Sequence, residues 1–172
     1  TNQIQVVGLN AAGTTILTIG TNTAYTANAT WRHLLASWNL ATAAAHLYIT
    51  DVEDLAAAPT LTDDSIDYTV ADWATGAQAN GGTKYNGCLA ECYLALEYID
   101  LSVTANRRKF ITAGGKPAFI GVNGILPTGT ASIIYSHLGL EIAASTFGTN
   151  FGSGGNFTIT GTLDLGSTSP SD

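Results

Sequence analysis

The chain has 172 residues, which is enough for one domain with a buried core. Hydrophobic residues make up 45% of it and charged residues only 11%, against about 25% charged in an ordinary globular domain. The formal net charge is −7, and the only cluster of basic residues is Arg107-Arg108-Lys109. This balance excludes a nucleic-acid backbone and an anionic membrane surface as partners, because both require a broad basic surface.

So few charges cannot cover a whole surface, so Ala, Thr, Ser, Gly and Asn must form much of the exterior. Such a surface suits a protein that keeps part of itself against neighbours in an assembly, and suits a freely diffusing enzyme less well. The first residues, Thr1–Gln5, contain neither a basic segment nor an apolar signal core. We therefore expect synthesis in a cytoplasm.

Short β-branched segments open the chain at residues 4–7 and 15–19, separated by turn-forming residues. Residues 29–40 then alternate between two faces, and residues 44–50 have the composition of an antiparallel partner strand. We predict a hairpin here. Trp31 and Trp38 fall on opposite faces of the alternating segment, and packing in a sheet core accounts for both.

The hairpin is expected to bring His33 opposite His46, which would mimic a site. A pair of hydrogen-bonded sheet histidines is the favoured interpretation. His137 lies far from both in the sequence, and no two of the three histidines have a metal-ligand spacing. Ser153 lies in a Gly-rich stretch without the strand–elbow–helix context of a hydrolase nucleophile.

Residues 51–82 differ from the flanking sequence because they hold seven of the 13 acidic residues. We interpret them as an acidic insertion with one or two short helical turns at residues 51–58, ended by Pro59. A short strand is expected at residues 65–70, followed by a Gly/Asn-rich loop at residues 74–83.

The acidic side chains of Asp63, Asp64 and Asp67 have the oxygen ligands that calcium prefers. They lack the alternating pattern of a calcium loop, so solvated loop charge is the favoured interpretation. We predict that the protein is not an enzyme and has no cofactor and no metal. A dispersed acid pair remains as an alternative, and its candidates are Asp63, Asp64, Asp67, Glu91 and Glu97.

Residues 88–103 fit a helical face and a strand face about equally well, and their Tyr, Ile and Val content favours a strand. Cys88 and Cys92 lie within this segment and are interpreted as reduced thiols, because a disulfide at this spacing in a strand would be strained. Further strands are expected at residues 109–112, 118–122 and 131–142.

The carboxyl end, residues 147–172, is interpreted as an arm on a β domain of residues 1–146. Residues 147–155 are predicted to form a flexible Gly-rich connector, and residues 157–165 have the cleanest alternation in the chain. This last strand either returns to its own sheet or adds to the edge of a neighbour. The candidate interface residues are Phe147, Phe151, Phe157, Ile159 and Leu163.

Eight or more short strands with Gly, Pro and Asn turns indicate a mainly β protein. The expected fold is an antiparallel β-sandwich resembling a jelly roll, with the short helices confined to residues 51–82.

The run from Ala24 to Thr50 joins a small-residue turn, a strand, a linker of Asn39 with Thr and Ala, and a second strand. This pattern covers about the first third of the chain and resembles tailed-phage virion structural β-sandwich proteins. Similar Ala/Thr/Gly-rich, Lys-poor proteins serve as capsid decoration (cement) proteins or as head or tail appendages. The resemblance implies a structural role in the virion.

The leading hypothesis is a bacteriophage capsid decoration protein that binds the major capsid protein or another virion protein. We expect it to be a homo-oligomer, with a homotrimer favoured, and to have no nucleic-acid or membrane partner. The alternative is the carbohydrate- or receptor-binding head of a tail fibre or other appendage. That alternative would use Trp73 and Tyr85 with nearby loop acids.

Overall fold

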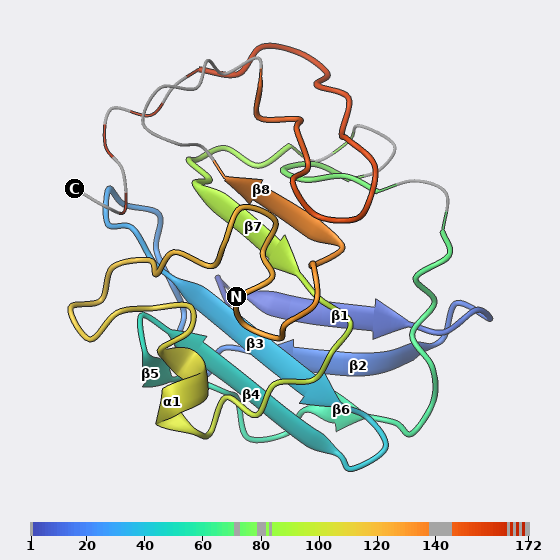
Figure 1. The fold of residues 1–172 in the computed structure, drawn as a ribbon. Helices are drawn as coiled ribbons and strands as arrows, with labels where there is room; N and C mark the ends of the chain where they lie inside the picture. The colour runs from blue at the N-terminus through green and yellow to red at the C-terminus, as the bar shows by residue number, and fades with distance from the viewer. Residues whose placement is uncertain are drawn as a thin grey trace. The chain divides into compact units, whose positions relative to one another are not determined.

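The computed structural model describes residues 2–70, 73–78, 82, 84–137, 146–164, 166, 168 and 170. The protein is mainly β, as predicted, with three small antiparallel sheets (Figure 1). Within the described residues the only helix is α1 (Thr104–Arg107). The chain divides into two compact units, unit 1 with Thr1–Thr69 and Tyr98–Phe119, and unit 2 with Val70–Glu97 and Ile120–Asp172.

Unit 1 contains two three-stranded sheets, which are antiparallel throughout. The first has the order β1 (Gln5–Leu9), β2 (Thr15–Gly20) and β6 (Thr60–Leu61). The second has the order β3 (Leu34–Asn39), β4 (Ala44–Ile49) and β5 (Val52–Glu53). The predicted hairpin is confirmed as β3 and β4, although β3 begins at Leu34 and not at residue 29.

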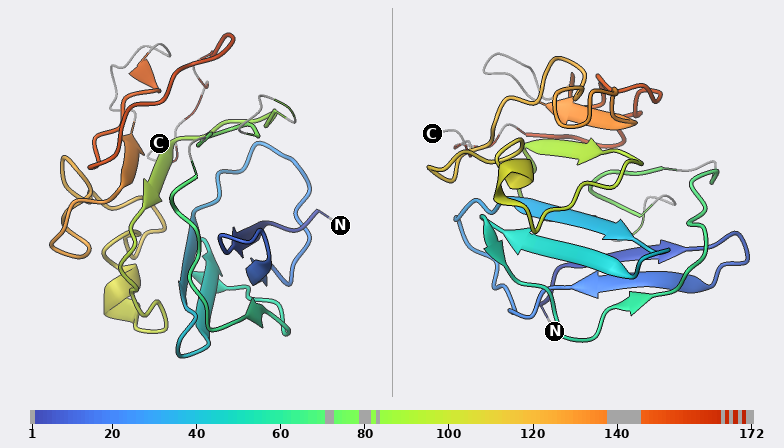
Figure 2. Two further views of the ribbon diagram at one scale, coloured as in Figure 1. Left: turned by 90° about the vertical axis from the view of Figure 1, so that its right-hand side faces the viewer. Right: turned by 60° about the horizontal axis from the view of Figure 1, so that its bottom comes forward.

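The two sheets of unit 1 lie against one another (Figure 2), and buried side chains from both form one hydrophobic core. Leu17 and Ile19 of β2 and Leu47 and Ile49 of β4 are buried and form its centre. Alternate residues of a strand point to opposite faces, so one face of each sheet contributes to this core. Each buried aliphatic side chain stabilises the unit by about 1.5–3 kcal/mol.

The helix predicted at residues 51–58 is wrong. Ile49 pairs directly with Val52, so Thr50 and Asp51 form a two-residue turn between β4 and β5. Both turn residues have positive φ, 48° and 66°, which is the backbone pattern of a type I′ hairpin turn. A chain that reverses at Asp51 cannot begin a helix there, and among the described residues of 51–82 no helix is present.

The strand predicted at residues 65–70 is also absent from the structure. The Asp67 carboxylate accepts hydrogen bonds from the Thr69 N–H at 2.9 Å and from the Thr69 hydroxyl at 2.6 Å. This local side-chain bonding competes with a regular strand, because it satisfies backbone donors within the turn.

Unit 2 contains a two-stranded sheet of β7 (Glu91–Leu94) and β8 (Ile134–His137). The strand interpretation of residues 88–103 is therefore confirmed for only four residues. No strand forms at residues 109–112 or 118–122, where the one pairing is an isolated bridge between Ile111 and Pro117. The strand predicted at residues 131–142 is confirmed at β8, and residues 138–142 lie outside the described part.

The Gly-rich segment of residues 147–155, interpreted from the sequence as a flexible connector, is bonded to β8 over part of its length. Asn150 is buried, and its Oδ1 accepts hydrogen bonds from the Tyr135 N–H at 2.8 Å and the Gly152 N–H at 3.0 Å. Its Nδ2 donates to the Ile133 carbonyl at 2.9 Å and the Gly155 carbonyl at 3.3 Å. One buried amide thus fixes the segment to β8.

The backbone of this segment lies so close to the backbone before β8 that it requires glycine. A Cβ on Gly152 would lie 2.5 Å from the Ser132 carbonyl oxygen, which is too near for any other residue. The Phe151 N–H also donates to the Tyr135 carbonyl at 2.7 Å. The glycines therefore let the backbone lie directly against the edge of β8.

The terminal strand predicted at residues 157–165 is not formed by residues 157–164, and Leu165 lies outside the described residues. One edge of β8 pairs with β7, and the segment around Asn150 bonds to the other. A returning strand therefore finds no vacant place beside β8. The Phe157 N–H instead donates to the Gly148 carbonyl at 2.8 Å.

The substitution Asn150→Ala tests the role of this amide. We expect the free energy of local opening in unit 2 to fall by about 2–4 kcal/mol, because buried donors and acceptors lose their partners. Amide hydrogen exchange at Tyr135 and Phe151 measures the change. The matched control is Asn86→Ala at an exposed position, and equal protection in both variants would contradict the role.

Candidate functional site

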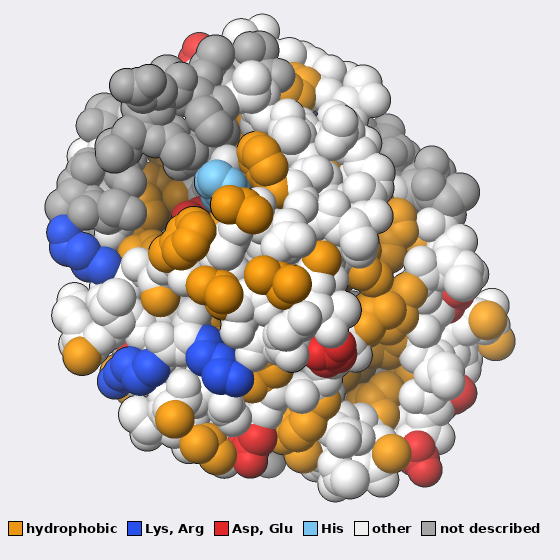
Figure 3. Space-filling view, viewed as in Figure 1, with side chains coloured by type: hydrophobic (Ala, Val, Ile, Leu, Met, Phe, Trp, Pro, Cys, Tyr) orange, Lys and Arg blue, Asp and Glu red, His pale blue; other side chains and the backbone are white. Residues whose placement is uncertain are grey.

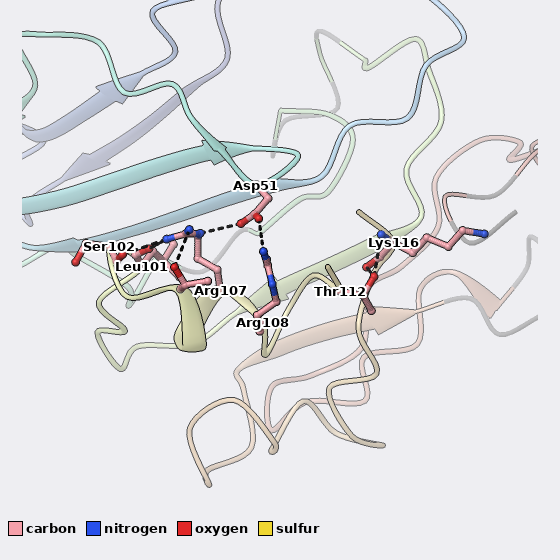
Figure 4. A network of polar contacts seen from close by, with 8 residues as sticks. Asp51, Leu101, Ser102, Arg107, Arg108, Thr112 and Lys116 are labelled. Carbon is pink, nitrogen blue, oxygen red and sulfur yellow. Dashed lines mark hydrogen bonds and ion pairs between the residues drawn. The ribbon is translucent and has the colours of Figure 1, made fainter. Parts of the chain in front are cut away.

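The densest charged network of unit 1 surrounds Asp51 (Figure 4). One carboxylate oxygen accepts a hydrogen bond from Arg107 Nε at 2.8 Å, and the other accepts one from Arg108 Nη2 at 2.7 Å. Arg107 Nη1 also donates to the carbonyls of Leu101 at 2.7 Å and Ser102 at 3.1 Å. These bonds attach the chain around α1 to the turn between β4 and β5.

The network is electrostatically strong for a partly exposed site. Hydrogen bonds from Arg108 and Arg107 lower the pKa of Asp51 from 3.8 to about 2, and the same contact raises the pKa of Arg108. The Arg107 guanidinium also lies 4.4 Å from the centre of the Tyr48 ring, within the range of a cation–π contact. Two of the three residues of the basic cluster, Arg107 and Arg108, therefore pair with Asp51 and stabilise the fold.

Packing explains what the network holds in place. Leu101, Phe110 and Ile111 flank the two arginines in the chain, and all three are buried. Leu35 and Tyr48 face away from the shared core and are buried as well. The ion pairs thus hold the buried residues before and after α1 against the second sheet of unit 1.

The histidines do not form a common site. The prediction that His33 lies opposite His46 is wrong, because the hairpin register pairs His46 with Ser37. His33 instead lies beside Thr50, whose N–H donates to the His33 carbonyl at 2.7 Å. Burial lowers the pKa of His33.

The other two histidines have separate neighbours in their own units. His46 Nε2 lies 3.3 Å from Asp100 Oδ1, and its Nδ1 lies 3.9 Å from Glu53 Oε1. His137 stacks on Tyr135 at 4.8 Å between ring centres and contacts Phe151 at 4.5 Å. The structure therefore uses His46 in pairing and His137 in packing.

Two of the acidic candidates, Asp64 and Asp67, accept hydrogen bonds within local turns. Asp64 accepts hydrogen bonds from Asn10 Nδ2 at 2.8 Å and the Ser65 N–H at 2.7 Å, and these bonds lower its pKa. Burial raises the pKa of Glu91, and the charge of His137 opposes that rise. In the described part of the chain, no group of three or more His, Cys, Asp or Glu side chains is placed to hold a metal ion.

The structure places the predicted interface residues in unit 2. Phe147, Phe151, Phe157 and Ile159 are half-buried, and the carbon chain of Ile159 packs beside Gly148. Leu163 is the most open of the set, at 42% exposed. The aromatic members are therefore tied to their own unit, and a contact with a partner stays a prediction.

The two residues of the alternative ligand site are open to solvent. Trp73 is 41% exposed and Tyr85 is 58% exposed. The Trp73 indole N–H donates to the Val70 carbonyl at 3.1 Å, and the Tyr85 backbone N–H donates to the Gly76 carbonyl at 2.7 Å. The Trp73 ring is thus held by a bond of its own side chain, whereas the Tyr85 bond holds only the backbone, and ligand binding by either ring stays a prediction.

Sequence reasoning missed an apolar loop between β7 and β8, at residues 120–126 of unit 2. Val122 is 73% exposed, Leu126 60% and Ile125 37%. The Leu126 N–H donates to the Ile120 carbonyl at 3.1 Å and closes the loop. The turn dipeptide Asn123-Gly124, with φ of 72° at Gly124, was the signal that these apolar residues leave the core.

Comparison with known proteins gives no relative. No protein-family model matches the chain, and no curated protein or solved structure matches it significantly. Within the part of the chain that the structure describes, no helix is long and apolar enough to cross a membrane.

Acid titration tests the Asp51 network. A carboxyl whose pKa is lowered in the folded protein contributes stability above its unfolded pKa, and this contribution is lost as the pH falls through the folded pKa. For Asp51 the loss falls between about pH 5 and about pH 2, and after solvent screening it amounts to about 1 kcal/mol. We expect Asp51→Asn to lower the free energy of unfolding at neutral pH by about 1–2 kcal/mol.

Chemical denaturation at a series of pH values measures both effects. Other carboxyls also titrate in this range, so the difference between wild type and Asp51→Asn isolates the network. Glu53→Gln is the matched control, because Glu53 lies on the adjacent strand and is more than half exposed. A wild-type-to-variant difference that stays constant from neutral to acidic pH would show that Asp51 contributes nothing through its charge.

Proposed function

We propose that this chain is a structural protein of a tailed-phage virion, of the capsid decoration type, and that it acts without catalysis. The observation that carries the proposal is the apolar loop at residues 120–126, where large side chains face solvent within a protein of very low charge. Exposed apolar clusters on soluble proteins mark interaction sites. On the face shown in Figure 3, hydrophobic side chains reach the surface at many points and charged ones are sparse.

Sparse charge strengthens this argument. Only six Lys and Arg residues are present, and Asp51 engages two of them. A surface with few ions costs little to desolvate when it is buried against a partner. The partner proposed is the major capsid protein or another virion protein.

The fold proposed for unit 1 is a small β-sandwich of the jelly-roll type. Two three-stranded antiparallel sheets that share a core support this arrangement. Sandwiches of this size bury one face of each sheet and leave the loops at their ends for binding.

The carboxyl end supports self-association. Residues 157–164 alternate apolar and polar side chains, and they form no strand within this chain. A strand of this composition gains stability by pairing with the sheet edge of another copy. We propose a homotrimer, in which each copy donates this segment to the next.

Truncation before Thr158 tests the donated segment. The cut keeps Asn156 and Phe157, whose bonds to Asn150 and Gly148 belong to the fold of unit 2. We expect the full chain to sediment at about 53 kDa, three times 17.8 kDa, and the truncated chain to sediment as a folded monomer. A truncated chain that still forms trimers would refute strand donation.

The apolar loop has its own test on particles. We expect mass spectrometry to detect the chain on purified heads of the virus that encodes it. In a binding assay on heads that lack this protein, we expect the double variant Val122→Asp/Leu126→Asp to bind at least about tenfold more weakly than wild type. The control Val52→Asp changes another exposed apolar residue, on β5 of unit 1. Particles without the chain would contradict the proposal.

A receptor- or carbohydrate-binding appendage is the second candidate function. The exposure of Trp73 and Tyr85 favours it, because open aromatic rings can stack on sugars. Binding on a glycan array that is lost in Trp73→Ala would place this function ahead of decoration.

A further inference from the structure

Unit 1 carries an open depression of about 340 Å³ between the end of β3 and the segment that follows β6. Its apolar lining includes Trp38, Leu40, Ile66 and Tyr68, and its polar lining includes Asp63 and Asp64. The volume lies at the lower end of the roughly 300–1,000 Å³ typical of small-molecule sites. Aromatic rings beside a few polar groups are the usual composition of such sites.

The aromatic floor of this depression is held in place before any ligand arrives. Burial raises the pKa of Tyr68, and a hydrogen bond with the Trp38 side chain opposes that rise. Trp38 and Ile66 also pack against the hydrophobic core of unit 1, which positions these two side chains independently of any ligand. A floor that is already ordered loses little entropy on binding.

The opposite wall is anchored to the first sheet at both ends. The Thr62 N–H donates to the Ile16 carbonyl at 2.9 Å, and the Asp67 N–H donates to the Leu9 carbonyl at 2.9 Å. A Cβ on Gly8 would lie 2.9 Å from Ile66 Cδ1, so the absence of a side chain at Gly8 lets Ile66 pack closely there.

The rim offers acceptors and no cation. Both oxygens of Asp64 already accept hydrogen bonds, from Asn10 and from the Ser65 backbone. Asp63 accepts none from the described residues, and its carboxylate is exposed. None of the described residues that line the depression is Lys, Arg or His. An anionic ligand would therefore be repelled, whereas a ligand with hydroxyl donors would find acceptors.

We propose that this depression binds a neutral sugar. A pyranose ring has one face of C–H groups, which fits over Trp38 and Tyr68, and an edge of hydroxyl groups, which donate to Asp63. Carboxylate acceptors form the stronger class of hydrogen bond with such donors. The site lies in unit 1, whereas Trp73 and Tyr85 belong to unit 2, so the inference does not depend on either candidate function above.

NMR titration of the full-length, ¹⁵N-labelled protein tests the site. The probes are the methyl glycosides of glucose, galactose, N-acetylglucosamine and rhamnose, with n-butylammonium as a cationic probe. We expect at least one sugar to shift the Trp38 indole N–H and the Ser65 amide in a saturable way, with a Kd of about 1 mM. The absence of saturable shifts with every sugar would overturn the proposal, as would a response to n-butylammonium alone.

The variant Asp63→Asn separates binding from folding, because this carboxylate is exposed and carries no bond of the fold among the described residues. We expect it to weaken sugar binding about tenfold, with the remaining amide spectrum unchanged. Asp164→Asn, at an exposed position of unit 2, is the matched control and should bind like wild type. Equal affinity for Asp63→Asn and wild type would overturn the proposal, whereas the trimer and particle assays would be unaffected.

Discussion

The ion pairs of Asp51 with Arg107 and Arg108 hold together the two parts of unit 1 that lie furthest apart in the chain. The partners are separated by 56 and 57 residues, and the first stretch of unit 2, Val70–Glu97, is inserted between them. Closing so long a connection costs entropy that grows only slowly with its length. A bidentate carboxylate with two guanidinium partners, together with the buried Leu101, Phe110 and Ile111, offsets that cost.

The turn that carries Asp51 explains why an acidic residue stands there. A type I′ turn requires positive φ at both central positions, and aspartate tolerates this backbone better than most residues. The same residue therefore shapes the turn and supplies the charge. This double role accounts for the loss of the predicted helix, because the geometry that reverses the chain also aims the carboxylate at α1.

The Asp51 network also affects how much charge remains on the protein surface. Charged residues make up only 11% of the chain, and two of its six basic side chains pair with one carboxylate. Small polar residues and exposed apolar side chains make up the difference on the surface. That is the surface expected of a protein whose working state is an assembly, and it is the physical basis of the decoration proposal.

Unit 2 is also stabilised by a polar side chain that joins separate segments, here a buried amide and not an ion pair. Its sheet has two strands, which are marginal by themselves, and a buried amide takes the place of a third. Asn150 satisfies donors and acceptors on the edge of β8, and Gly152 permits the close approach. This arrangement closes that edge, and residues 157–164 have no partner strand among the residues that the structure describes. An alternating segment left in this state is suited to pairing between copies.

The sequence by itself determined the mainly β class, the β3–β4 hairpin and the low-charge surface. These depend on local alternation, on turn residues and on composition, which a single chain displays directly. The turn dipeptide Asn123-Gly124 predicts a loop near residues 120–126. The sequence does not predict that the apolar side chains of this loop are exposed. Alternation shows that Val122 and Leu126 are apolar and does not show whether another element covers them.

Only the tertiary structure decided which distant residues meet. The partner of the Arg107-Arg108 cluster, the buried role of Asn150 and the depression beside Trp38 all join segments that no local pattern connects. Residues 51–58 have a composition compatible with a helix, and the pairing of Ile49 with Val52 overrode it. The physical reason is that long-range contacts outweigh the small free energies of local propensity, and a single sequence does not encode those contacts in any periodicity.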